Sequence, residues 1–474
     1  MRTRRKPPTR PRSPPNMSAE PRTLADVGRL VASKALTSEA VTERCLERIT
    51  EQNRTLNAFV SVLDDDAVAQ AKKADQEIAA GRYRGPLHGI PISLKDIIDL
   101  RNAPTTAASR VRDGHIARRD ATVVGRLREA GAIFIGKTNL HEFALGTTNE
   151  DSAYGPVLHP LDSTRSPGGS SGGSAASVLA GMAYASIGTD TGGSIRIPSS
   201  ACGLVGLKAT IGELPTDGIV PLSETLDHVG PMCLSVEDTA LLYGVLRGIS
   251  NPEPLASRDV RGMRFGIPRA YFLDLLDAQV AARFDEACER LRAAGAILDD
   301  VMIRHTKEIG TIYVHIALPE AAAYHAATLD SRPQDYTENV RLRLEMGRYI
   351  LAEDNLRAMH ARATLRRAVD KALEGLDALM LPALATAAPV LGAATVETGR
   401  STEPVRAMML RLTQLFNVTG HPAIALPCGI GRDGLPRAIQ LVGHRGNTER
   451  LLAVAATVER QIIGGAGSVG GGTG

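Results

Sequence analysis

A serine that follows two glycines is the first place where this sequence could do chemistry. In GTDTGGSIR (188–196), Ser194 lies in a loop after the strand-like segment YASIG (184–188). Gly192 and Gly193 have no side chains, so their backbone N–H groups are free to converge on one point. Converging N–H donors stabilise the oxygen of a carbonyl under attack, and one such donor is typically worth about 10²- to 10³-fold in rate. Ser194 is therefore a candidate nucleophile.

The base that such a serine needs must come from another segment, because no histidine lies beside it. In GIPISLKDI (89–97), the alternation of a strand places Lys95 on the face opposite Leu94 and Asp96, so Lys95 and Asp96 do not pair. Burial without a carboxylate lowers the pKa of a lysine from about 10.4 toward neutrality, which is what a general base requires. The alternative is a surface lysine whose stem covers apolar neighbours.

Three longer motifs make the sequence resemble the amidase signature family of serine hydrolases. The central one runs from SPGGSSGGS (166–174) through GTDTGGSIR to CGLVGLKAT (202–210). GPLHGIPISLKD (85–96) precedes it and NVTGHPAIALPCG (417–429) follows it, and the resemblance extends from about residue 23 to residue 462. It implies an α/β amidase-signature fold, in which a large central mixed β-sheet is covered by helices on both faces and carries a mostly helical cap insertion.

The resemblance also assigns roles to residues, because a serine, a cis-serine and a lysine carry the reaction in that family. It maps the nucleophile onto Ser194, the bridging cis-serine onto Ser170 and the base onto Lys95. Ser170 and Lys95 precede Ser194 by 24 and 99 residues, as in the family. The implied oxyanion hole consists of the backbone N–H groups of Thr191, Gly192, Gly193 and Ser194. The side chains implied to support it are Ser171, Asp190 and Arg196. Neither a metal nor a cofactor is expected.

The implied activity is hydrolysis of a C–N amide-type bond through an acyl-enzyme on Ser194. The expected substrate is a small-molecule amide, aryl amide or carbamate (urethane), with esterase activity as a side reaction. No nucleic acid or membrane partner is expected, and the chain is expected to be a monomer or homodimer. The glutaminase component of glutamyl-tRNA amidotransferase, known as its A subunit, is the alternative. It shares the triad and releases ammonia from glutamine for a partner protein, and the motifs fit both activities.

Three shorter motifs match a known pattern but lack its context. GAIFIGKT (131–138) matches the phosphate-binding loop GxxxxGK[ST], yet the residues between its glycines are strand-like, so nucleotide binding is a remote alternative. GSSGG (169–173) matches the nucleophile elbow of α/β-hydrolases, but polar residues precede it where a buried strand is needed. HEFAL (141–145) begins like a zinc-binding helix and has Leu145 where the second histidine belongs.

Composition and patterning indicate an ordinary α/β protein. Of the 474 residues, 43% are hydrophobic and 23% are charged. Strand-like segments alternate with helix-like ones, which favours a sheet with helices on its faces. Residues 310–376 are almost wholly helical in pattern, which predicts a cap region. We expect a disordered, basic, Pro-rich leader (1–22), a single catalytic domain (23–463) and a flexible Gly-rich tail (464–474).

Charge and cysteine usage indicate where the protein works. Residues 1–16 carry six Lys and Arg and no acid, so without them the net charge of +3 becomes −3. The five cysteines are far apart and include no CxxC pair, which argues against disulfides and structural zinc. No apolar run reaches the roughly 18–20 residues of a membrane span, and none follows the basic N-terminus as in a secretion signal. We therefore expect a cytoplasmic protein.

Overall fold

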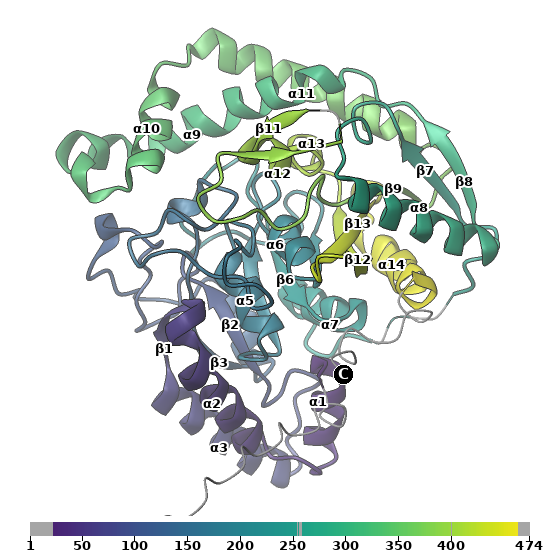
Figure 1. Cartoon of the computed structure of the whole chain (residues 1–474). Coiled ribbons are helices and arrows are strands. Elements are labelled where there is room, and N and C mark those ends of the chain that lie inside the picture. The colour runs from purple at the N-terminus through teal and green to yellow at the C-terminus, as the bar shows by residue number, and fades with distance from the viewer. Residues whose placement is uncertain (1–21, 254, 256–257, 400, 463–474) are drawn as a thin grey trace, which may run out of the picture.

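The computed structural model describes residues 22–253, 255, 258–399 and 401–462 (Figure 1). The predicted leader, apart from Arg22, and the whole of the predicted tail lie outside these residues.

One mixed β-sheet runs through the molecule. Within the described residues it has eleven strands in the spatial order β1-β3-β2-β4-β6-β5-β12-β13-β9-β7-β8. The strands are β1 (Phe59–Val62), β2 (Pro91–Lys95), β3 (Ile133–Thr138), β4 (Ala185–Thr189), β5 (Val205–Lys208), β6 (Val229–Cys233), β7 (Arg264–Pro268), β8 (Ile297–Val301), β9 (Ala378–Pro382), β12 (Ala423–Ile430) and β13 (Pro436–Val442). A separate antiparallel pair consists of β10 (Thr395–Glu397) and β11 (Thr402–Pro404). The predicted mixed sheet is thus confirmed.

Helices flank the sheet (Figure 1). They are α1 (Leu24–Ala32), α2 (Ser38–Leu56), α3 (Asp64–Ala79), α4 (Thr122–Glu129), α5 (Gly172–Leu179), α6 (Arg196–Ala201), α7 (Val236–Arg247), α8 (Ala278–Ala293), α9 (Ile309–Ser331), α10 (Glu338–Arg348), α11 (Ala352–Leu373), α12 (Val405–Leu410), α13 (Gln414–Thr419) and α14 (Thr448–Ile462). Short 3₁₀ turns are η2 (Arg110–Arg112), η3 (Glu142–Ala144), η4 (Thr306–Glu308) and η5 (Pro333–Asp335). None of the helices in the described part of the chain is long and apolar enough to cross a membrane.

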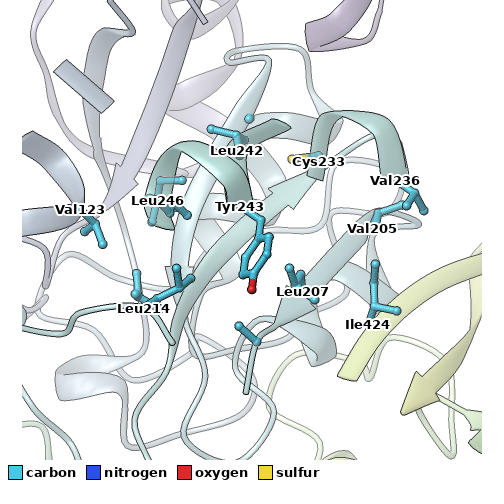
Figure 2. Packing of buried hydrophobic residues seen from close by; sticks show 14 of the residues in the cluster. Val123, Val205, Leu207, Leu214, Cys233, Val236, Leu242, Tyr243, Leu246 and Ile424 are labelled. Carbon is cyan, nitrogen blue, oxygen red and sulfur yellow. The ribbon is translucent and has the colours of Figure 1, made fainter. Parts of the chain in front are cut away.

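The core forms where the apolar faces of these helices meet the sheet. Figure 2 shows Leu242, Tyr243 and Leu246 of α7 gathered with Val205 and Leu207 of β5. All five side chains are buried. Burying a side chain of the size of leucine stabilises a fold by about 1.5–3 kcal/mol, so contacts of this kind fix the helices on the sheet.

The cap region is helical, as the sequence pattern predicts. Helices α9, α10 and α11 lie together at the top of the molecule in Figure 1, and α12 and α13 lie beneath them. Helix α9 packs against α10, α11 and α13. The cap is therefore joined to the C-terminal part of the chain that leads back into the sheet.

The neighbouring parallel strands β3, β2 and β4 all end at the same edge of the sheet. Strand β2 pairs in parallel with β3 on one side and with β4 on the other. Because parallel strands end on the same side, the residues that follow them meet there. Lys95 ends β2 and Thr189 ends β4. The residues Ile133–Thr138 of the GxxxxGK[ST] match form strand β3, so this segment is not a phosphate-binding loop.

Candidate functional site

Lys95 is enclosed at the end of β2 and has hydroxyl partners. Its side chain is fully buried. The ammonium nitrogen Nζ donates to Ser170 Oγ at 2.7 Å and to Thr189 Oγ1 at 2.8 Å. No carboxylate in the described residues forms an ion pair with it. Burial lowers the pKa of Lys95 to about 7, while the charges of Asp227 and Asp190 raise it. The structure thus places Lys95 in a buried position without a carboxylate in contact, as the strand alternation predicts.

Ser170 lies in the glycine-rich loop that precedes α5. The peptide bond between Gly169 and Ser170 is cis, as the resemblance implies. Little space surrounds this backbone: a Cβ atom on Gly169 would lie 2.8 Å from the backbone nitrogen of Asn149. Gly172 opens α5, and its N–H donates to the Asn149 side-chain oxygen at 2.9 Å. Glycine is thus required for this loop to approach the Asn149 backbone, and the close packing holds Ser170 against Lys95.

Ser194 lies beside this loop, and its backbone rather than its hydroxyl connects the two segments. The N–H of Ser171 donates to the Ser194 carbonyl oxygen at 3.3 Å. Within the described residues, the hydroxyl of Ser194 forms no hydrogen bond, and none joins it to Ser170. The side chain of Ser194 is 6% exposed, whereas Ser170 and Lys95 are fully enclosed. Of the three predicted residues, Ser194 is therefore the one that is not completely enclosed.

The loop before Ser194 presents unpaired backbone donors. Across the part of the chain that the structure describes, no acceptor is bonded to the N–H groups of Thr191, Gly192, Gly193 or Ser194. Gly193 has a φ of +144°, a conformation that glycine adopts readily and other residues rarely. Four adjacent, mostly buried N–H groups without a partner are costly in a folded protein unless they serve a ligand. Free N–H donors of this kind are what stabilising an oxyanion would require.

A charged network fixes this loop from behind. The guanidinium of Arg196 donates through Nε and Nη2 to the two carboxylate oxygens of Asp190, each at 3.0 Å. Asp190 in turn accepts the N–H of Ile195 at 3.2 Å, which anchors the chain directly after Ser194. Asn417 donates to Asp190 at 2.8 Å and accepts from Arg196 at 2.6 Å. The Arg196 charge, with these hydrogen bonds, holds the pKa of Asp190 well below its usual range despite burial.

Ser171 contributes on the other side of the loop. Its hydroxyl donates to the Thr189 carbonyl oxygen at 3.2 Å. Because Thr189 holds Lys95 through its own hydroxyl, Ser171 connects the glycine-rich loop to the end of β4. The three side chains expected to support the site are all buried: Asp190 and Arg196 pair with each other, and Ser171 bonds to the end of β4.

Side chains from the cap and the C-terminal segment complete the site, and the sequence motifs did not assign them roles. Thr413 donates its hydroxyl to the Gly192 carbonyl oxygen at 2.6 Å. A Cβ atom on Gly192 would lie 2.6 Å from the Tyr313 hydroxyl, so α9 touches the loop directly. Asn417 is the first residue of NVTGHPAIALPCG, and its place in that motif is the only signal in the sequence for its role. Tyr313 has no such signal because its proximity arises entirely from how the cap packs.

A cavity of about 410 Å³ reaches the same corner of the sheet. Thr189 and Thr191 line it, together with Asp227 and apolar side chains such as Ile97 and Leu222. Thr189 contacts Lys95, so the cavity lies one side chain away from Lys95, and it is large enough for a small organic molecule. Within the described residues, no group of three or more His, Cys, Asp or Glu side chains could hold a metal ion.

Comparison with known proteins identifies a family for the chain. The family model described as Amidase matches residues 40–452. An amidase from Pseudomonas putida is 40% identical over 430 residues, covering 88% of this chain and 91% of the relative. The A subunit of the glutamyl-tRNA(Gln) amidotransferase from Anaeromyxobacter dehalogenans is 38% identical over 483 residues, covering 93% and 96%.

A solved structure is similar over the same span. The crystal structure of an amidase superimposes with a TM-score of 0.88 at 35% sequence identity, covering 93% of this chain and 100% of the other. The family model spans most of the chain and the relatives are aligned over nearly their whole lengths. This protein belongs to the Amidase family.

Proposed function

We propose that this protein hydrolyses a C–N amide-type bond of a small molecule, with Ser194 as nucleophile and Lys95 as base. The observation that carries the proposal is the buried Lys95 amine, bonded only to hydroxyl groups, next to a loop with four unpaired N–H donors. A lysine with a pKa of about 7 is substantially uncharged at neutral pH and can accept a proton. Membership of the Amidase family supports the same assignment.

Acylation would begin with attack of Ser194 Oγ on the substrate carbonyl carbon. The Ser194 proton would pass to Ser170 Oγ while Ser170 gives its own proton to Lys95 Nζ, 2.7 Å away. The resulting oxyanion would accept hydrogen bonds from the unpaired N–H groups of residues 191–194, which stabilise charge that exists only during the reaction. Lys95, now an ammonium, would return the proton by the same route to the leaving nitrogen. The C–N bond then breaks, and Ser194 is left as an ester of the acyl group.

Deacylation would use the same groups with water in place of the Ser194 hydroxyl. Lys95, neutral again, would take a proton from water through Ser170, and the hydroxide formed would attack the ester carbonyl. The second oxyanion would collapse with return of the proton to Ser194 Oγ. The products are an amine and a carboxylic acid or, from a carbamate cleaved at its C–N bond, an amine and a carbonic acid half-ester. Each proton taken up by Lys95 is returned within the same half-reaction.

The test is a panel of chromogenic anilides, carbamates, esters and glutamine, assayed with the wild type and Ser194→Ala. Ser194→Ala is expected to lose turnover of every substrate while circular dichroism and thermal unfolding remain those of the wild type. Ser186→Ala is the matched control, because Ser186 is also buried and lies on β4 with its hydroxyl on the Ser93 carbonyl oxygen. Near-wild-type turnover by Ser194→Ala would show that the assignment is wrong.

The same panel separates a second candidate, a glutaminase that supplies ammonia to a partner protein. The 38% identity to the A subunit of a glutamyl-tRNA(Gln) amidotransferase favours it. Glutamine as the dominant substrate, together with a stoichiometric partner in a pull-down, would establish this candidate. Turnover of anilides or carbamates by the isolated chain would establish the first.

We also propose a substrate class, a cellular compartment and an oligomeric state for the protein. A small amide, aryl amide or carbamate is the substrate class, and esters would react as a side activity because they share the acyl-enzyme route. All five cysteines are free thiols, which suits a reducing cytoplasm. The chain would act as a monomer or a homodimer.

A further inference from the structure

Asp227 lies next to the site and binds two parts of it together. One carboxylate oxygen accepts the hydroxyl of Thr191, the first residue of the loop with unpaired donors, at 2.5 Å. The other accepts the N–H groups of Leu222 at 2.8 Å and of Ser223 at 3.1 Å. Asp227, Thr191 and Leu222 also line the cavity of about 410 Å³. A single carboxylate therefore connects the donor loop to the segment at Leu222 and Ser223.

Asp227 differs from Asp190, the other carboxylate whose charge acts on Lys95. Asp190 forms an ion pair with Arg196 at 3.0 Å, and that positive charge offsets much of its effect. Asp227 accepts hydrogen bonds only from neutral donors, and within the described residues no lysine or arginine forms an ion pair with it. A negative charge held by neutral donors acts on its surroundings without an opposing charge. Asp227 is thus an uncompensated anion whose field reaches the proposed base.

We propose that Asp227 is a positioning residue for the reaction, acting through Lys95 and Thr191. Its carboxylate stabilises the ammonium that Lys95 becomes when it accepts a proton, and it fixes the start of the loop that receives the oxyanion. This proposal rests on the proposed function, because it requires Lys95 to gain and lose a proton during turnover. It adds a residue that none of the sequence motifs indicated.

The electrostatic surroundings support this role. Burial raises the pKa of Asp227 to about 6, while its hydrogen bonds and Lys95 lower it. Lys95 titrates at about 7, so the two groups change charge over the same pH range and their titrations are coupled. The other titratable groups facing this corner are on different elements: Asp190 after β4, Tyr313 on α9, and Asp217, Glu224 and His228 around the cavity.

The active form of the enzyme then has a neutral Lys95 and an ionised Asp227. As the pH falls below 7, Lys95 gains a proton and kcat/KM falls with a slope of one. Below about pH 6, Asp227 gains a proton as well, and the slope on a logarithmic plot steepens toward two. Asp227→Asn removes the charge that favours the ammonium, so it lowers the pKa of Lys95.

The experiment is the pH dependence of kcat/KM for an anilide substrate between pH 5 and 9, with the wild type, Asp227→Asn and Thr191→Val. For Asp227→Asn we expect the acid limb to move to lower pH by about one unit, with a slope of one throughout. We expect its plateau rate to fall about tenfold, because the donor loop is less well held. Thr191→Val keeps the carboxylate, so it should lower the plateau and retain the two-proton slope.

Asp238→Asn is the matched control. Asp238 on α7 also has a pKa raised to about 6 by burial, and it also accepts two backbone N–H groups, those of Leu24 and Ala25. Its bonds fix α1 rather than the site, so this variant should lose stability and keep the wild-type pH profile. A pH profile that shifts equally in Asp238→Asn would overturn the proposal, because loss of any buried carboxylate would then suffice.

Two further outcomes would overturn the proposal, and the first of them needs no variant. A wild-type acid limb that keeps a slope of one down to pH 5, with the fold intact by circular dichroism, would overturn the proposal. An unchanged midpoint in a folded Asp227→Asn would do the same. Either result leaves the proposed function standing as long as Ser194→Ala is inactive, whereas a wild type without amidase activity removes the proposed function itself.

Discussion

Two lysines on adjacent strands are equally buried and are placed for different purposes. Lys95 ends β2 and Lys137 lies near the end of β3, one register position apart in the parallel pairing. Both side chains are fully enclosed. The Lys137 amine lies 3.0 Å from Asp96 Oδ1 and donates to the Pro104 carbonyl oxygen at 2.8 Å. Among the described residues, the Lys95 amine bonds only to the hydroxyls of Ser170 and Thr189.

The partner therefore decides what a buried lysine can do. Burial lowers the pKa of both amines, and at Lys137 the contact with Asp96 opposes this effect directly. At Lys95 the opposing charges are not in contact, and the pKa falls to about 7. Strand alternation is the origin of the difference: Asp96 follows Lys95 in the chain, but its carboxylate pairs with Lys137 across the sheet. The carboxylate thus maintains one lysine as an ion and leaves the other available as a base.

Removing the Lys95 amine should have the largest effect on turnover. Lys95→Met keeps most of the side-chain volume and leaves the Ser170 hydroxyl without a base. We expect kcat for an anilide to fall about 10³- to 10⁴-fold, because proton transfer to and from the reacting atoms is lost. The measurement is steady-state turnover at pH 8, with active protein quantified by its folded fraction.

Stability serves as the control for Lys95→Met. The pKa of Lys95 is about 7 in the folded protein and 10.5 as an ordinary lysine, so between these values the unfolded chain binds more protons. The contribution of Lys95 to the stability of the wild type therefore rises between pH 7 and pH 10.5. At pH 7 the folded protein still bears the cost of burying the Lys95 charge. Lys95→Met should be at least as stable as the wild type at pH 7. A large loss of stability would attribute the lost activity to misfolding instead.

The second change is made at Lys137. Lys137→Met removes the positive charge beside Asp96. The Asp96 carboxylate then stays buried with Thr106 as its donor side chain, and a buried charge without a partner is destabilising. We expect the free energy of unfolding to fall by about 3–5 kcal/mol, while kcat per folded molecule changes little. Urea denaturation at pH 7 measures the free energy of unfolding. Active-site titration gives the concentration of active enzyme, from which kcat per folded molecule is calculated.

The double variant Lys137→Met with Asp96→Asn tests the cause of that loss. Neutralising Asp96 removes the unpaired charge, so the double variant should be more stable than Lys137→Met alone. If the two are equally unstable, packing rather than charge determines the role of Lys137. If Lys137→Met instead abolishes turnover in folded protein, the division between the two lysines is wrong.

The sequence predicted the segments of the site whose chemistry is local. The glycine-rich loop, the strand ending in Lys95 and the loop before Ser194 each have a pattern that can be read from neighbouring residues. The alternation in β2 was sufficient to predict that Lys95 and Asp96 do not pair. Most strands of the sheet and the helical cap were also predictable, because hydrophobic periodicity reports them.

The remainder depends on contacts between segments far apart in the chain. Asp227 reaches Thr191 across 36 positions, and Thr413 reaches Gly192 across 221. No local pattern distinguishes either side chain from an ordinary loop residue. Strands β5 (Val205–Lys208) and β6 (Val229–Cys233) were not predicted, because they contain Gly206, Gly230 and Pro231, which strand patterns normally lack.

The finest test of the comparison is the leaving group. An amine departs from a tetrahedral intermediate only after it is protonated, whereas a phenol or alcohol is a much better leaving group without help. Lys95→Met should therefore lose more activity on an anilide than on the phenyl ester with the same acyl group, with the ester retaining about tenfold more of its wild-type rate. Lys137→Met should leave the anilide-to-ester ratio unchanged, because the Lys137 amine contacts Asp96 and not the reacting groups. Equal losses on both substrates in Lys95→Met would mean that Lys95 activates Ser194 but does not return the proton to the leaving nitrogen. Water would then be the general acid.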